Sequence, residues 1–259
     1  MNLLEIEMKY EVLKDEFIEL NGRKLYRIKA LKNFCHIEKG EVGGYIESEQ
    51  NLSQKGGAWV SGNAWVSGNA WVSGDAQVYG GARVYGDAQV YGDAWVSDNA
   101  RVHGDARVYG NALVSDNTQV YSDAHVYGDA HVYGNALVSG DAHVYGGARV
   151  YGNAWVSGNA QVYGDARVYG NALVSDNAQV SNRHSVVWFS NVGTENGTLT
   201  VYCGKNGLIA TRGCFIGSVE EFLAKPAKVH GEKTKREYEL LIEVARSRLK
   251  EAQGNIGSE

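Results

Sequence analysis

Three histidines in the middle of the chain, His125, His131 and His143, are the residues whose type most readily suggests chemistry. His125 and His143 are 18 residues apart, so a chain that coils every 18 residues would place them on adjacent coils about 5 Å apart. Two imidazoles at that distance could bind a metal ion. Each histidine, however, occupies a position that other repeats of the chain fill with Gln or Arg. We therefore interpret all three as exchangeable surface residues and expect no metal site.

The cysteines and the known catalytic motifs point to no reaction either. Cys35, Cys203 and Cys214 form an odd and sparse set, which is typical of reduced thiols in a cytoplasm rather than of a disulfide framework. Cys203 and Cys214 belong to no CxxC motif, and we interpret both as small buried hydrophobic residues. The sequence contains no phosphate-cradling loop, GxSxG motif or pair of catalytic carboxylates. We expect no cofactor and favour a protein without catalytic activity, with an enzyme as an open alternative.

The histidines belong to a six-residue repeat that begins at Ala58. Val occupies every sixth position from Val60 to Val180, which gives 21 repeats, and Ala precedes each Val by two residues except at Thr118. Residues two apart in a strand face the same side, so Ala and Val should be buried together. Gly followed by Asn or Asp supplies the turns. Three repeats would close a three-sided coil of 18 residues, and residues 58–181 therefore predict a parallel β-helix of about seven coils.

The turn residues support the 18-residue period, because sorting by 18 separates Asn from Asp. One corner carries Asn63, Gly81, Asn99, Asn117, Asn135, Asn153 and Asn171. The next corner carries Asn69, Asp87, Asp105, Asp123, Asp141, Asn159 and Asn177. Stacked Asn side chains can hydrogen-bond to one another along the helix. Stacked Asp side chains repel one another and need cations, water or nearby Arg.

The residues on either side of each Val should point outward and form flat faces. On the face that begins at Trp71, the residues after Val include Tyr91, Tyr109, Tyr127, Tyr145 and Tyr163. The residues before Val on this face include Arg107, His125 and His143. A flat aromatic strip beside polar donors suits sugar rings, bases or a partner protein, so these eight residues are candidates for binding. Duplication of two kinds of repeat would produce the same strip without any function.

Residues 1–57 should cap the first exposed end of the β-helix. Residues 10–30 predict a β-hairpin around the turn Asn21-Gly22. Residues 31–57 predict an imperfect first coil. Trp59, Trp65 and Trp71 supply one tryptophan for each of the three sides, and we expect them to pack against this cap.

Residues 182–259 predict a small α+β domain that ends in an amphipathic helix. Three short strands are expected at residues 186–189, 198–202 and 208–210. The capping box Ser218-Val219-Glu220-Glu221 predicts a first helix, and residues 233–250 a second one. Tyr202, Lys205 and Arg212 are candidates for a basic binding site in this domain.

Charge and hydropathy exclude several classes of protein. The formal net charge is -5, and residues 58–181 carry 11 acids against 5 bases, so direct nucleic-acid binding is not expected. No apolar run is long enough to span a membrane, and the start of the chain lacks an apolar signal core. The sequence therefore indicates a cytoplasmic protein.

Two segments resemble known families. The stretches Arg27-Ile28-Lys29-Ala30, Gly43-Gly44-Tyr45-Ile46 and Asn51-Leu52-Ser53-Gln54, followed by Trp59, resemble the entry segment of YdcK-type hexapeptide-repeat proteins. The stretches Thr211-Arg212-Gly213-Cys214-Phe215, Val219-Glu220-Glu221-Phe222 and His230-Gly231, with Tyr238, resemble a domain recurrent in phage and prophage proteins. The resemblance implies a left-handed β-helix in a phage or prophage setting, and it transfers no catalytic residue.

Together these observations favour a non-catalytic binding or scaffold protein, with the β-helix as a rigid platform. In the phage setting that the resemblance implies, it would inhibit or sequester a component of host defence in the bacterial cytoplasm. That component would be a nucleotide-like signal or a host protein, and we expect a homo-oligomer, either a dimer or a trimer. Two alternatives stay open: a hexapeptide acyltransferase that uses a His at a subunit cleft, and a structural, tail-associated β-helix.

Overall fold

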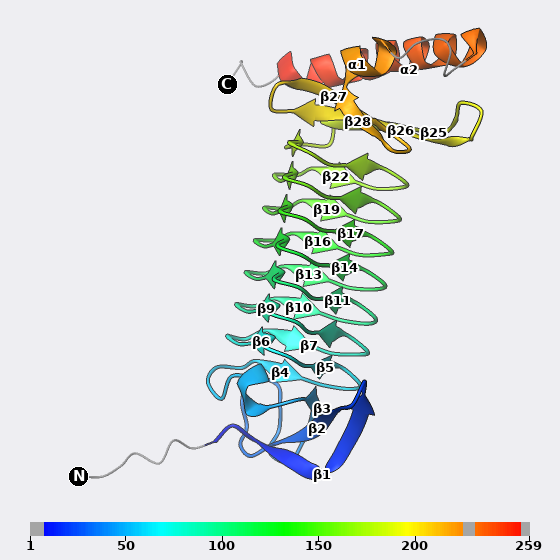
Figure 1. The fold of residues 1–259 in the computed structure, drawn as a ribbon. Coiled ribbons are helices and arrows are strands. Elements are labelled where there is room, and N and C mark those ends of the chain that lie inside the picture. The colour runs from blue at the N-terminus through cyan, green and yellow to red at the C-terminus, as the bar shows by residue number, and fades with distance from the viewer. Residues whose placement is uncertain (1–7, 225–230, 255–259) are drawn as a thin grey trace. The chain divides into compact units, whose positions relative to one another are not determined.

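The structure is a computed structural model that describes residues 8–224 and 231–254 (Figure 1), with side chains described as far as residue 249. His230, one of the residues of the phage-like segment, lies outside these ranges. The chain is mainly β, with a parallel β-solenoid followed by a small domain of antiparallel strands and helices, which confirms the predicted fold class. Its contacts divide it into two compact units, residues 1–128 and 129–259. Each unit is described by itself.

Unit 1 begins with the predicted hairpin. Strand β1 (Tyr10–Leu20) pairs antiparallel with β2 (Arg23–Ala30), and the turn residues Asn21 and Gly22 have φ of 51° and 76°. Two positive φ angles are typical of the tight turn that matches the twist of paired strands. Strand β2 then pairs antiparallel with β3 (Val42–Ile46), which pairs in parallel with the repeat strand β5 (Trp65–Val66). A short 3-10 helix, η1 (Glu49–Asn51), follows β3. The hairpin thus extends one face of the solenoid.

The repeats of unit 1 form two-residue strands that stack on three faces. The hairpin face contains β3, β5 (Trp65–Val66), β8 (Arg83–Val84), β11 (Arg101–Val102) and β14 (Gln119–Val120). The second face contains β4 (Trp59–Val60), β7 (Gln77–Val78), β10 (Trp95–Val96) and β13 (Leu113–Val114). The tyrosine face contains β6 (Trp71–Val72), β9 (Gln89–Val90), β12 (Arg107–Val108) and β15 (His125–Val126).

The same pattern continues in unit 2. Strands β16 (His131–Val132), β19 (Arg149–Val150) and β22 (Arg167–Val168) stack on one face, named here the arginine face. Strands β17 (Leu137–Val138), β20 (Trp155–Val156) and β23 (Leu173–Val174) form the second, and β18 (His143–Val144), β21 (Gln161–Val162) and β24 (Gln179–Val180) the third. In both units every repeat Val and Ala is at most 1% exposed, so the predicted inward pair is confirmed.

The asparagine corner also forms the predicted ladder. Asn99 donates a side-chain hydrogen bond of 3.2 Å to Asn117 in unit 1, and Asn153 donates one of 3.1 Å to Asn171 in unit 2. The ring of tryptophans against the cap is only partly correct. Trp59 is buried and packs edge-on to Phe34 at 5.4 Å, whereas the Trp71 side chain is 44% exposed, although Leu52 of the cap pairs with the neighbouring Val72.

The small domain follows β24. Strands β25 (Val186–Val192), β26 (Gly197–Gly204), β27 (Gly207–Arg212) and β28 (Phe215–Ser218) form an antiparallel sheet in sequence order. The sequence predicted three of these strands and missed β28, whose four residues are too few to show an alternating pattern. The predicted capping box is confirmed, because Ser218 N donates to Glu221 at 2.8 Å and Glu221 N donates to Ser218 at 3.1 Å.

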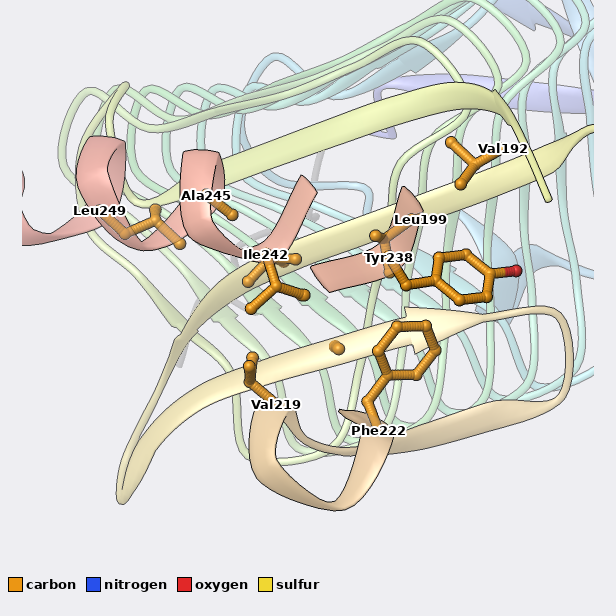
Figure 2. Packing of buried hydrophobic residues seen from close by; sticks show 10 residues of the cluster. Val192, Leu199, Val219, Phe222, Tyr238, Ile242, Ala245 and Leu249 are labelled. Carbon is orange, nitrogen blue, oxygen red and sulfur yellow. The ribbon is translucent and has the colours of Figure 1, made fainter. Parts of the chain in front are cut away.

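Two helices cover one side of this sheet. They are α1 (Val219–Ala224) and α2 (Glu232–Gly254). Figure 2 shows the apolar core between these helices and the sheet. Its residues include Phe222 of α1, Tyr238 and Ile242 of α2, and Val192 and Leu199 of the sheet. In the described part of the chain, every helix is too short or too polar to serve as a membrane span.

One turn position is strained where serine replaces glycine. The residue before each corner Asn or Asp adopts left-handed backbone, and in most repeats it is Gly, as at Gly110 with φ of 68°. Ser122 occupies the same position with φ of 58°. Any Cβ is sterically unfavourable in this region. Asp and Asn offset this cost through local hydrogen bonds of their side chains, and serine does so less effectively.

We predict that Ser122→Gly raises the free energy of unfolding by about 0.5–1 kcal/mol, because glycine adopts this conformation without penalty. Gly110→Ser is the matched control, since it introduces the same mismatch and brings a Cβ within 2.9 Å of the Gly128 backbone nitrogen. It should lower stability. Thermal and denaturant unfolding of both variants measure the effect, and a Ser122→Gly protein less stable than the parent would contradict the assignment of strain.

Candidate functional site

A cleft of about 820 Å³ opens in unit 1 between the hairpin turn and the outward side chains of the hairpin face. The hairpin contributes Leu20, Asn21, Arg23 and Leu25. The solenoid contributes, among others, Trp65, Asn69, Arg83, Tyr85, Asp87 and Arg101. The cleft exists because Tyr26 of β2 pairs with Ile46, the last residue of β3, so the hairpin tip continues past the end of β3.

The charges in this cleft do not balance. Arg23 pairs with Glu47 at 3.3 Å, and Asp87 accepts a hydrogen bond of 2.8 Å from Asn69. Arg83 and Arg101 are register partners on the adjacent strands β8 and β11. Within the described ranges, neither guanidinium has a carboxylate partner. At the rung spacing of about 4.8 Å, two like charges repel by about 1 kcal/mol in water and by more where solvent is excluded.

Aromatic rings line the same face. Trp65 lies against Tyr85 with ring centroids 5.5 Å apart, and the Arg83 guanidinium lies 5.8 Å from the centre of the Trp65 ring. Tyr85 stacks on His103 at 4.7 Å, and His103 stacks on Tyr121 at 5.3 Å. Burial, assisted by the nearby Arg101 charge, lowers the pKa of His103, so its imidazole is neutral at neutral pH. The cleft therefore combines an apolar, aromatic part with two unpaired cations.

The tyrosine strip expected from the sequence forms within each unit. In unit 1, Tyr91 stacks on Tyr109 at 4.9 Å and Tyr109 on Tyr127 at 4.8 Å, and in unit 2 Tyr145 stacks on Tyr163 at 5.1 Å. A planar ligand needs about 3.5 Å on each side, or about 7 Å between two rings. The ring faces inside the ladder are therefore closed to ligands. The strip offers ring edges and hydroxyl groups, and burial by the neighbouring side chains raises the pKa of Tyr109.

The other candidates on the repeats lie outside the cleft. Arg107 is exposed on β12, and His125 is half-buried on β15 with its ring edge-on to Tyr109 at 6.2 Å. His131 and His143 are half-buried on β16 and β18 in unit 2. Each histidine stands in the outward slot that Arg or Gln fills elsewhere, as the sequence predicted.

The three candidates in the small domain do not converge on one site. Tyr202 is fully buried, and its hydroxyl donates to the carbonyl of Ser175 and accepts from the Ser175 amide, each at 3.1 Å. Burial raises the pKa of Tyr202 to about 12. This residue is therefore out of reach of a ligand, and its role is to satisfy the backbone at the last repeat strands.

Arg212 is also held by the fold. Its guanidinium donates to the carbonyl of Val192 at 2.9 Å and lies 3.7 Å from Glu195, with its side chain only 10% exposed. Lys205 is exposed and lines a small hollow of about 180 Å³ with Gln161 and Gln179. In the structure as described, no contact joins these three residues, so the expected basic site does not form.

Sequence patterns alone did not mark Trp65, Arg83 and Arg101 as residues of a cleft. The signal was present, because the 18-residue period places Arg83 and Arg101 on adjacent coils with like charges stacked. Their connection to the hairpin tip depends on the offset between β2 and β3, which no repeat pattern reveals.

Tyr202→Phe tests the capping role. Removing the hydroxyl leaves the Ser175 amide without a partner in a buried place, so we predict a loss of about 1–3 kcal/mol in the free energy of unfolding. Tyr163→Phe is the control, since that side chain is only half-buried and its loss should change stability little. Denaturant unfolding compares the two, and equal small effects would contradict the capping role.

The geometry defines the class of protein as a β-solenoid repeat protein. The family model of the YdcK β-solenoid repeat matches residues 58–74, 76–92, 88–104, 106–122, 130–146, 148–164, 160–176 and 166–182. The repeats of residues 58–182 are therefore similar to the YdcK β-solenoid repeat. A comparison of the chain with curated proteins gave no match.

Proposed function

We propose that this protein is a non-catalytic binding protein that holds a small anionic ligand in the hairpin cleft. The observation that carries the proposal is the stacked pair Arg83 and Arg101, which faces the cleft without a described carboxylate partner. An anion between the two guanidiniums would remove their mutual repulsion and accept charge-assisted hydrogen bonds from both.

The shape of the cleft indicates the rest of the ligand. Its volume falls in the range of small-molecule sites, about 300–1,000 Å³. Leu20, Leu25 and Trp65 form an apolar part beside the cations. A ligand with a planar ring and an anionic group, such as a nucleotide, would satisfy both parts at once.

The groups at this cleft favour binding over catalysis. Ser67 and Tyr85 are the hydroxyl-bearing residues that line it, and the Ser67 side chain is buried with no described base hydrogen-bonded to it. His103, the nearest imidazole on this face, is held between the rings of Tyr85 and Tyr121. A nucleophile and its base need to be within hydrogen-bond reach, and these groups offer no such pair.

A narrower proposal rests on the resemblance of the C-terminal segment to phage and prophage domains. In that setting the protein would act in the bacterial cytoplasm and sequester a nucleotide-like signal of host defence. A sequestering protein needs affinity and abundance but no turnover, which agrees with a rigid repeat platform that carries a cleft.

Titration calorimetry of Arg83→Gln and Arg101→Gln tests the cleft. With adenosine monophosphate as the probe, we expect each substitution to weaken binding by about tenfold or more, because each removes one charge-assisted contact. Arg107→Gln is the matched control, since Arg107 is an exposed arginine of the tyrosine face outside the cleft. Binding that all three substitutions leave unchanged would contradict the proposal.

The same titration with further probes separates the parts of the ligand. Adenosine tests the contribution of the ring to binding, and inorganic phosphate tests that of the anion. A cyclic dinucleotide tests both together. We expect the phosphorylated compounds to bind more tightly than adenosine and to weaken as salt is added. Adenosine binding as tightly as its monophosphate would contradict an anion site.

A further inference from the structure

The arginine face of unit 2 carries a column of cationic side chains. His131, Arg149 and Arg167 are register partners on β16, β19 and β22. Within the described residues, Arg149 and Arg167 have no ion pair, and Arg149 is exposed. Asp165, the acid nearest in sequence to Arg167, is instead bound by Arg183 at 3.1 Å. Two guanidiniums are therefore stacked without compensation on this face.

Aromatic side chains border this column. Tyr133 stacks on Tyr151 at 4.9 Å and Tyr151 on Tyr169 at 5.0 Å, and Trp188 of β25 meets Tyr169 edge-on at 4.1 Å. Arginine, tyrosine and tryptophan are the residue types most enriched where proteins bind one another. The composition of this face thus fits a protein partner that presents negative charge.

Unit 1 contains a matching column of the opposite sign. Asp87, Asp105 and Asp123 occupy the aspartate corner on successive coils, and all three are exposed. The carboxylates of Asp105 and Asp123 have no hydrogen bond or ion pair among the residues that the structure describes. Like charges repel along this column too, so it is a natural counterpart for stacked cations.

The spacing of the two columns identifies the partner. Equivalent rings on adjacent coils are 4.8 Å apart at Tyr109 and Tyr127 in unit 1 and 4.9 Å apart at Tyr133 and Tyr151 in unit 2. Both charge columns share this repeat, because the same coil generates both. An extended acidic peptide repeats same-facing side chains every 6.4–6.8 Å or so, and would lose register after one or two contacts.

We infer that the arginine face of one copy binds the aspartate corner of a second copy of this chain. Arg149 and Arg167 meet successive aspartates of the partner, and the tyrosine edges add contact area. Single exposed ion pairs contribute little, so the association depends on several pairs in register and on low salt. Arg149, Arg167, Asp105 and Asp123 do not line the hairpin cleft, so substitutions at these four residues test this contact separately from the cleft.

Charge reversal tests the contact by sedimentation velocity. The intact protein should associate at about 0.1 M salt and dissociate at about 1 M salt, where screening is stronger. The double variants Arg149→Glu/Arg167→Glu and Asp105→Lys/Asp123→Lys should each associate at least tenfold more weakly. An equimolar mixture of the two should regain association, because each reversed column then meets its complement.

The controls make a negative result interpretable. Arg107→Glu/Asp93→Lys changes two other exposed charges and should leave association unchanged. Circular dichroism confirms that each variant folds, and Arg149→Gln/Arg167→Gln provides a milder change with a partial loss of association. A protein that is monomeric at low salt would overturn the inference. So would association that survives either reversal, or a mixture of the reversed variants that stays monomeric.

Discussion

Every structural feature of the repeats depends on one constraint, which is that each residue lies over the residue 18 positions away. Backbone groups bond directly to the next coil, as when Ser61 N donates to the carbonyl of Val78 at 2.9 Å. Each side chain therefore has a neighbour at a fixed distance of about 4.8 Å. Inside the coil this favours Ala and Val, because identical small and branched side chains stack without gaps.

On the surface the same constraint acts on each residue type differently. Asn is both donor and acceptor, so an Asn column bonds to itself, as Asn135 does to Asn153 at 3.1 Å. Tyrosine rings stack at the coil spacing and close their faces to other molecules. Arg and Asp have only one sign of charge, so their columns repel. A repeat that duplicates such residues thus creates sites that an outside ion or molecule can stabilise, as at the columns of Arg83 with Arg101 and of Arg149 with Arg167.

The sequence predicted what the period controls and missed what the ends control. The regular spacing of valine from Val60 to Val180 predicted the coil. The hairpin turn at Asn21-Gly22 and the capping box of residues 218–221 were also predicted, because the signal for each lies within a few residues. Predicting the cleft would have required the offset between β2 and β3, which is a tertiary feature that no local sequence signal encodes. Tyr202 was predicted as a ligand-binding residue, whereas it is buried. The sequence of a short strand does not reveal which of its side chains face the last repeat strands.

The ends matter because only there does the chain leave the repeat. At the last coils in unit 2, Leu173 N donates to the hydroxyl of Thr200 at 3.1 Å and Thr211 donates to the Leu173 carbonyl at 2.8 Å. These side chains, together with a backbone hydrogen bond of 3.2 Å from Lys205 N to the Asn177 carbonyl, thus replace the strand that a further coil would have supplied. In unit 1, β3 pairs with β5 along its backbone, and the hairpin, which pairs with β3, extends past the end of β3 and overhangs the hairpin face. In unit 1 the hairpin tip leaves a cleft beside the hairpin face, whereas in unit 2 the capping contacts include the buried hydroxyl of Tyr202, which makes Tyr202 a structural residue.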